Sequence, residues 1–149
     1  MFFYIFPYFV VYVYSLYIYI TKTHDKIKIG DLLIVLIPAF LVAVLRGNIG
    51  VDTANYSRFF LDKINKVSDS YTFEIGFEKI IDFLVFLNFN IYGIFAAIAL
   101  IITVCLCISF SGSKSSALLF LLVFFPLFYV DSTMNALRYG LSFSISCPE

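Results

Sequence analysis

The residues with the clearest capacity for chemistry are two arginines in or beside apolar stretches, Arg46 and Arg138. Arg46 ends a short apolar stretch and is followed by Gly47, Gly50 and Asp52. Glycines permit a tight turn, and a turn that leads into a helix N-terminus presents backbone N–H groups that can receive an anion. An arginine at such a boundary can reach a phosphate, or it can anchor the segment to lipid headgroups. The residues alone leave both interpretations open.

The second arginine belongs to a polar stripe. Asp131, Asn135, Arg138 and Ser142 are spaced at i, i+4, i+7 and i+11, which predicts that they share one face of a helix. A polar stripe with an arginine on a membrane helix is expected to face the protein interior or a water-filled cavity. The alternative is a purely structural contact between Asp131 and Arg138.

A third group of charges consists of Glu74, Glu78 and Asp82, with Lys79 beside them. The three acids recur every fourth residue, so they form a stripe on an amphipathic helix that is expected to begin near Thr72. A solvated face is the simpler explanation of this stripe.

Metal, thiol and nucleic-acid chemistry find little support. Cys105 and Cys107 lie inside an apolar run with Cys147 further on, and His24 lies alone in a lysine-rich loop. A zinc site needs about four clustered nitrogen or sulfur ligands, so buried apolar cysteines are expected and no metal or cofactor is predicted. The formal net charge is zero, which argues against nucleic acid as a partner.

These residues must be positioned by elements that lie in lipid. Hydrophobic residues make up 62% of the 149 residues and charged residues 13%, and the mean hydropathy is +0.97. A soluble domain of this size needs more polar surface. We therefore expect an all-α, polytopic transmembrane helical bundle that forms a single membrane domain over residues 1–149.

Apolar blocks of membrane-spanning length give the expected helices. The predicted spans are residues 2–20, 32–45, 91–110 and 117–130, followed by a partial helix over 134–146. The short-loop lysines lie at Lys22, Lys26, Lys28 and Lys114. Because such lysines favour the cytoplasmic side, the amino terminus and residues 46–82 are expected outside.

The outer segment is expected to form amphipathic helices that lie flat at the membrane surface or simply connect the spans. Asp52 or Thr53 can cap the first of them. Its apolar residues recur at helical spacing and are Tyr56, Phe59, Phe60, Ile64 and Val67.

At these residues the chain resembles the EpsG-type exopolysaccharide polymerases, relatives of the Wzy O-antigen polymerases. The first resembling motif is a short span ending in Arg46 and followed by Gly50, Asp52, Thr53 and Tyr56. A Glu-x-Gly-Phe step opens the next helix at Glu74, Gly76 and Phe77. A later Asn-x-x-Arg helix is formed by Asn135 and Arg138, with Ser142 and Ser144 in its small-residue region.

The resemblance implies a multi-pass glycosyltransferase of the bacterial cytoplasmic membrane. Such enzymes join oligosaccharide repeat units, carried on undecaprenyl pyrophosphate, into exopolysaccharide, capsule or O-antigen. It implies that Arg46 and Arg138 hold the pyrophosphate or the charge of the leaving group and that Asp52 or Glu74 is the base. The remaining motif residues, Gly50, Thr53, Tyr56, Glu74 and Asn135, would bind substrate. The implied partners are the lipid-linked oligosaccharide, membrane lipid and other polysaccharide-assembly proteins.

Members of that family are usually more than twice this length, so we expect the chain to be the amino-terminal part of a longer polytopic protein and inactive alone. Two other functions stay open. A transporter or flippase for lipid-linked sugars would use the same arginines without chemistry. A non-catalytic membrane scaffold would use them only to anchor its spans.

Overall fold

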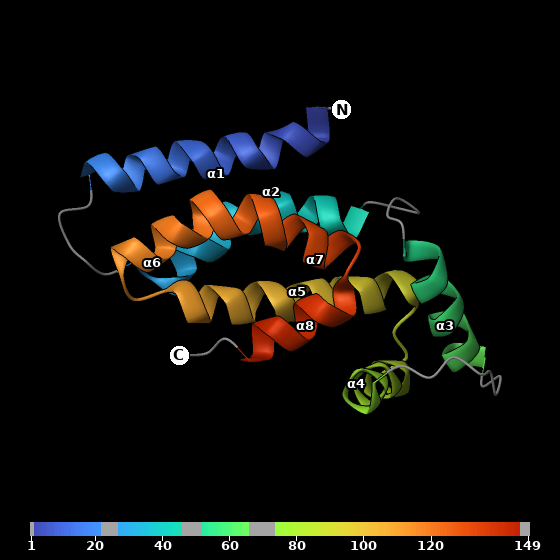
Figure 1. Cartoon of the computed structure of the whole chain (residues 1–149). Helices are drawn as coiled ribbons and strands as arrows, with labels where there is room; N and C mark the ends of the chain where they lie inside the picture. Colours follow the sequence, from blue (N-terminus) through green and yellow to red (C-terminus); the bar gives the residue numbers. More distant parts are fainter. Residues whose placement is uncertain (1, 22–26, 46–51, 66–73, 147–149) are drawn as a thin grey trace.

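The computed structural model describes residues 2–21, 27–45, 52–65 and 74–146, and within these ranges it contains helices and no strands (Figure 1). The expected all-α class is confirmed for this part of the chain. The helices are α1 (Phe2–Thr21), α2 (Ile29–Leu45), α3 (Thr53–Asn65), α4 (Ile75–Phe86), α5 (Ile91–Phe110), α6 (Lys114–Leu119), the π-helix η1 (Phe120–Tyr129), α7 (Val130–Met134) and α8 (Leu137–Ser146).

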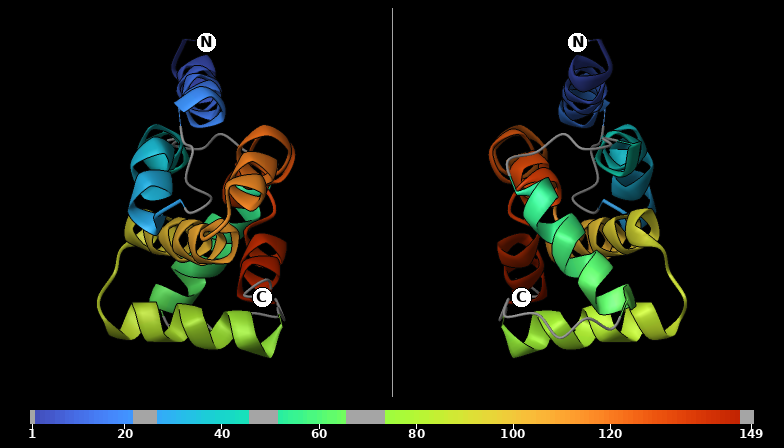
Figure 2. Two further views of the ribbon diagram at one scale, coloured as in Figure 1. Left: turned by 90° about the vertical axis from the view of Figure 1, so that its left-hand side faces the viewer. Right: turned by 90° about the vertical axis from the view of Figure 1, so that its right-hand side faces the viewer.

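The long helices form a bundle in which successive helices run in opposite directions. Four long helices lie side by side, roughly parallel to one axis: α1, α2, α5 and the continuous helix α6–η1–α7 (Figure 1). Helices α3 and α4 lie at one end of this bundle (Figure 1). Viewed along that axis, α4 lies crosswise to the bundle helices (Figure 2). A helix in this orientation lies in the plane of a membrane that the bundle crosses.

Two of the described helices are long and apolar enough to cross a membrane. They are α5, with 20 residues, and the helix Lys114–Met134, with 21 residues. The apolar stretches Ile5–Ile20 and Ile29–Leu45 are shorter. The crossing of the bilayer by all four helices therefore stays a prediction.

The surface of the bundle is apolar where lipid is expected. Ile20 and Leu127 each expose 75% of their surface, and large apolar side chains are exposed on α2 and α5 as well. Isolated exposed apolar residues are ordinary in soluble proteins, but faces of this extent on several helices suit a hydrocarbon solvent.

A polar contact in the bundle interior joins two described helices that are distant in sequence. The hydroxyls of Thr103 on α5 and Tyr129 on η1 lie 2.9 Å apart, and both residues are buried. Thr103 donates to the carbonyl of Ala99 at 2.7 Å, which leaves Tyr129 to donate to Thr103. Both hydroxyls are thereby satisfied, and the bond joins two helices where apolar side chains alone give little specificity.

The π-helical segment surrounds Pro126, which lacks a backbone N–H and clashes with the carbonyl four residues earlier in an ordinary α-helix. The wider π-helix accommodates such a residue without ending the helix. The helix therefore continues through α7 to Met134.

The structure corrects the expected helix over residues 134–146 and its polar stripe. The chain turns back after Met134, and α8 begins at Leu137 and runs antiparallel to α7, beside α5 (Figure 1). The carbonyl of Asp131 accepts from the backbone N–H groups of both Asn135, at 2.7 Å, and Ala136, at 3.0 Å. This bifurcated arrangement ends α7. Asp131 and Arg138 therefore lie on different helices.

The reversal depends on a close approach of α8 to α7 at Gly140. A Cβ atom added there would lie 2.5 Å from the Cβ of Ser132 and 2.9 Å from its carbonyl oxygen. One of these atoms belongs to the backbone, so the contact cannot be relieved by a rotamer change. Only glycine fits this position.

We predict that Gly140→Ala destabilises the protein by about 1–3 kcal/mol, because an extra methyl group must push α8 away from α7. The matched control is Gly30→Ala, since a Cβ at Gly30 meets no described atom within 4 Å. Thermal unfolding in detergent measures both variants. Equal melting temperatures for the two variants would contradict the close approach.

Candidate functional site

Charged and polar side chains from three helices meet at the end of the bundle where α3 and α4 lie. Nη1 of Arg138, at the start of α8, lies 3.3 Å from Oε1 of Glu74, which directly precedes α4. The Arg138 side chain is 26% exposed and the Glu74 side chain 59%. The contact joins two positions that are 64 residues apart in sequence, and it replaces the expected alternative of an Asp131–Arg138 contact.

Tyr56 on α3 is the third member of this site. The tyrosine is 4% exposed, and the backbone N–H of Arg138 donates a hydrogen bond to its hydroxyl oxygen. Arg138 is the second residue of α8, so its N–H is one of the helix-terminal donors that have no partner inside the helix. The Tyr56 hydroxyl therefore caps α8 from a different helix.

The pKa of Tyr56 is raised above its usual value of 10.0, chiefly by burial. The hydrogen bond from Arg138 and the charge of its guanidinium lower the pKa, while the charges of Asp52 and Glu74 raise it. The phenol is therefore neutral at physiological pH and keeps its proton for donation. The same interactions show that three of the other expected residues, Asp52, Glu74 and Arg138, lie within electrostatic reach of Tyr56.

An aromatic cluster holds α3 and α4 in place beside the site. Tyr56 lies 6.1 Å from Phe77 of α4 and 6.2 Å from Phe60, measured between ring centroids. Phe60 in turn meets Phe95 of α5 edge-on at 5.0 Å. The cluster thus fixes Tyr56 on the end of a long bundle helix.

The acidic stripe of α4 is divided between two cations. Lys63 of α3 pairs with Asp82 at 3.0 Å and with Glu78 at 3.9 Å, while Glu74 pairs with Arg138. The Glu74 and Asp82 side chains are 59% and 57% exposed, as a solvated face predicts, and the three acids also form these ion pairs. They tie α4 to α3 at one end and to α8 at the other.

A groove of about 610 Å³ runs between α4 and α8 from this charged end. Glu74 and Arg138 lie at its start, and Ser142, Ser146 and Gly76 also line it. Its apolar walls are Phe77, Ile80, Leu141 and Ile145. The groove therefore offers a cation next to an apolar surface, which matches the two chemical halves of a lipid phosphate.

The remaining expected residues lie apart from the groove or outside the described ranges. Asn135 donates its amide to the carboxylate of Asp131 at 2.8 Å and so belongs to the turn between α7 and α8. Thr53 is buried in the first turn of α3, and Asp52 is exposed just before it. Arg46 and Gly50 lie outside the described residues, although Leu45 ends α2 at the same end of the bundle as the start of α8 (Figure 1).

Sequence reasoning missed the apolar walls of the groove and the role of Gly140. The signal that could have revealed this role is an isolated glycine in a helical pattern, Gly140, because such a glycine often marks a close contact between helices.

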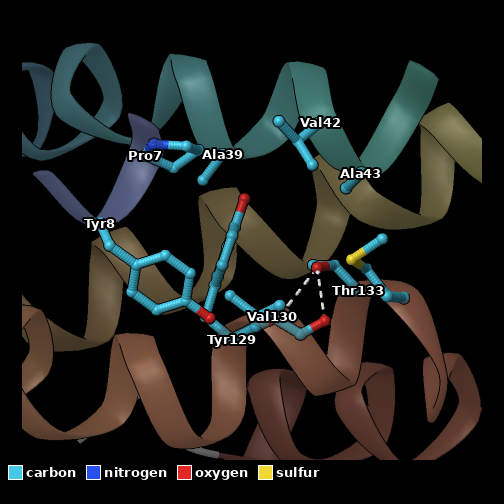
Figure 3. Close-up of a pocket in the computed structure, with 9 residues that line it drawn as sticks. Pro7, Tyr8, Ala39, Val42, Ala43, Tyr129, Val130 and Thr133 are labelled. Atoms are coloured by element: carbon cyan, nitrogen blue, oxygen red, sulfur yellow. Dashed lines mark hydrogen bonds between the residues drawn. The ribbon is translucent and has the colours of Figure 1, made fainter. Parts of the chain in front are cut away.

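A second pocket, of about 390 Å³, lies between α1, α2 and the η1–α7 helix (Figure 3). Pro7, Tyr8, Ala39 and Tyr129 are among its lining residues, and no charged side chain of the described residues lines it. The hydroxyl of Thr133 points back to the carbonyls of Tyr129 and Val130 at 2.8 and 3.3 Å (Figure 3). The described lining of this pocket therefore supplies hydroxyl groups but no cation for a phosphate.

In the part of the chain that the structure describes, no three His, Cys, Asp or Glu side chains gather as a metal site would require. The chemistry available at the candidate site is therefore that of a guanidinium, a carboxylate and a neutral phenol.

We predict that Tyr56→Phe speeds amide hydrogen exchange in the first turn of α8 and lowers stability by about 1 kcal/mol, because the Arg138 N–H loses its acceptor. Tyr92→Phe is the control, since Tyr92 on α5 is exposed. Exchange mass spectrometry resolves the first turn of α8 from the rest of the chain. Unchanged exchange there in Tyr56→Phe would contradict the cap.

Comparison with known proteins places the chain in a family. The chain matches no curated protein and no solved structure significantly. The model of the EpsG family matches residues 28–148, which include α2 to α8 and every residue of the candidate site. A match over most of the chain shows that the protein belongs to the EpsG family, whose members are membrane proteins of the polysaccharide-polymerase type.

Proposed function

We propose that this chain forms the pyrophosphate-binding part of a membrane glycosyltransferase that joins undecaprenyl-pyrophosphate-linked oligosaccharide repeat units into exopolysaccharide, capsule or O-antigen. One observation carries the proposal. Arg138 lies at the N-terminus of α8 and at the charged end of a groove whose other walls are apolar. A lipid-linked pyrophosphate is a double anion on a hydrocarbon chain, and this groove complements both parts.

The proposed chemistry needs fixed positive charge. When the sugar chain leaves its carrier, negative charge grows on the departing pyrophosphate, and a guanidinium in a low-dielectric site stabilises that charge with two parallel hydrogen bonds. The backbone N–H groups at the start of α8 add partial positive charge at the same end. Arg138 would therefore act on the leaving group.

The other motif residues have proposed roles around this arginine. Arg46, the next residue in sequence after α2, would provide a second cation for the pyrophosphate, and Gly50 would contribute to substrate binding. Asp52, exposed before α3, would be the base that takes the proton of the acceptor hydroxyl. Tyr56 would hold α8 and orient Arg138, while Thr53 and Asn135 would support the helix ends that shape the site.

The proposed setting is the bacterial cytoplasmic membrane, with four spans and the candidate site on the outer side. The antiparallel bundle puts α3, α4 and the start of α8 at one end and the loop before α6 at the other (Figure 1). The short-loop lysines favour the cytoplasm for that second end. Substrate would therefore meet Arg138 from outside.

We predict that, in the intact protein, Arg138→Ala and Arg46→Ala sharply reduce high-molecular-weight polymer in cells, since each removes a positive charge that stabilises the leaving group. Loss of a charged hydrogen bond is worth about 1.5–3 kcal/mol, or roughly a tenfold to hundredfold loss of rate. Arg58→Ala is the control, because Arg58 is an exposed arginine of α3. Normal polymer from both site variants would overturn the proposal.

Two alternatives give different results in this system. Arg138→Lys keeps the charge but loses the guanidinium fork, so a scaffold that needs only an anchor tolerates it and a polymerase does not. In vesicles with lipid-linked repeat units already on the outer side of the bilayer, a polymerase extends chains. A flippase gives no chain growth there.

The proposed orientation predicts the labelling of single cysteines in a protein whose three native cysteines are replaced by alanine. Lys79→Cys on α4 should react with a membrane-impermeant maleimide added to intact cells from outside. Ser115→Cys near the start of α6 should react only after the membrane is permeabilised. Both positions are exposed in the structure. The reverse pattern would place the site in the cytoplasm and contradict the orientation.

A further inference from the structure

We propose that Glu74 is an exchangeable internal anion: its carboxylate occupies the Arg138 guanidinium until a phosphate of the lipid carrier displaces it, so that α4 controls entry to the groove. This inference rests on the proposed function and adds a means of regulating the same site. It gives Glu74 a role different from that of a base.

The contact between Glu74 and Arg138 has the properties of a replaceable pair. The Nη1–Oε1 distance is 3.3 Å, and the Glu74 side chain is 59% exposed. Glu74 occupies the N-cap position of α4. Within the described residues, its side chain makes no capping hydrogen bond to a backbone N–H of that helix. Such an exposed ion pair contributes about 0–1 kcal/mol.

A phosphate group competes well against this carboxylate. Phosphate oxygens accept two parallel hydrogen bonds from a guanidinium, and a pyrophosphate carries more negative charge than one carboxylate. The ligand would also place its hydrocarbon part on Leu141 and Ile145, which a carboxylate cannot do. Displacement therefore costs little and gains contacts along the groove.

α4 is held by α3 from Phe77 onward, so only the residues before Phe77 can move by themselves. Phe77 lies within 6.4 Å of Phe59, and Lys63 pairs with Asp82 at 3.0 Å. Both contacts join α4 to α3. Gly76 lines the groove, and a Cβ added there meets no described atom within 4 Å. Breaking the Glu74–Arg138 pair therefore releases the segment from Glu74 to Gly76, while α4 from Phe77 onward stays anchored.

The test measures binding of geranyl pyrophosphate to the whole chain in lipid nanodiscs by isothermal calorimetry. Glu74→Gln should bind about two- to fivefold more tightly than the unaltered protein, because the competitor is lost. Glu78→Gln is the matched control: it removes the same charge from α4, next to Lys63 rather than Arg138, and should change affinity little. Arg138→Gln should bind about tenfold more weakly.

The results separate this inference from the proposed function. If Arg138→Gln binds more weakly but Glu74→Gln binds no more tightly than the unaltered protein, the exchange is wrong and the phosphate site stands. If Arg138→Gln binds as tightly as the unaltered protein, both are wrong.

A second readout detects displacement itself. A spin label at Gly76→Cys, with the native cysteines replaced by alanine, should become more mobile when geranyl pyrophosphate is added, and should be mobile without ligand when Glu74→Gln is also present. Tighter binding by Glu74→Gln without any change in label mobility would indicate simple removal of electrostatic repulsion, and would overturn the exchange.

Discussion

A guanidinium at the N-terminus of a helix is the constraint on which this end of the molecule depends. The start of a helix carries partial positive charge, so Arg138 is placed where a cation is least favourable and where an anion is most strongly attracted. The Glu74 carboxylate forms an ion pair with the Arg138 guanidinium, and the Tyr56 hydroxyl accepts a hydrogen bond from the backbone N–H of Arg138. An arginine needed only to anchor a span would be better placed at the C-terminal end of a helix.

Several features of the fold follow from putting Arg138 there. The turn after Met134 is closed by the Asp131 carbonyl, and α8 can return only because Gly140 lets it approach Ser132. The return brings α8 beside α5 and under the start of α4. The aromatic cluster around Tyr56 then holds α3 and α4 against the end of α5, so the partners of Arg138 come from segments that are held in place by packing.

The sequence predicts the bundle helices well because each is a long apolar run, and α5 has the bounds expected from composition alone. The sequence also predicts Arg138 as a candidate site residue, because a charged side chain in an apolar segment is costly to bury. The reversal at Asn135 escapes prediction because the i, i+4, i+7 spacing of Asp131, Asn135 and Arg138 persists across a turn that backbone hydrogen bonds create. The Glu74–Arg138 pair escapes because 64 residues separate two side chains whose meeting depends on that reversal.

The groove also bears on where a reaction of a lipid-linked substrate can take place. A pyrophosphate cannot enter the apolar bundle without losing its hydration, and its hydrocarbon chain cannot leave the bilayer without exposing apolar surface. A site for such a molecule must therefore lie where a charged end and an apolar wall are continuous. The start of α8 provides this continuity over roughly 12 Å from Arg138 to Ser146, at a rise of about 1.5 Å per residue. α4 lies crosswise to the bundle helices (Figure 2). Glu74, just before α4, lies at the charged end of this path, so the position of this segment decides whether that end is open, and the residue it places there is itself an anion.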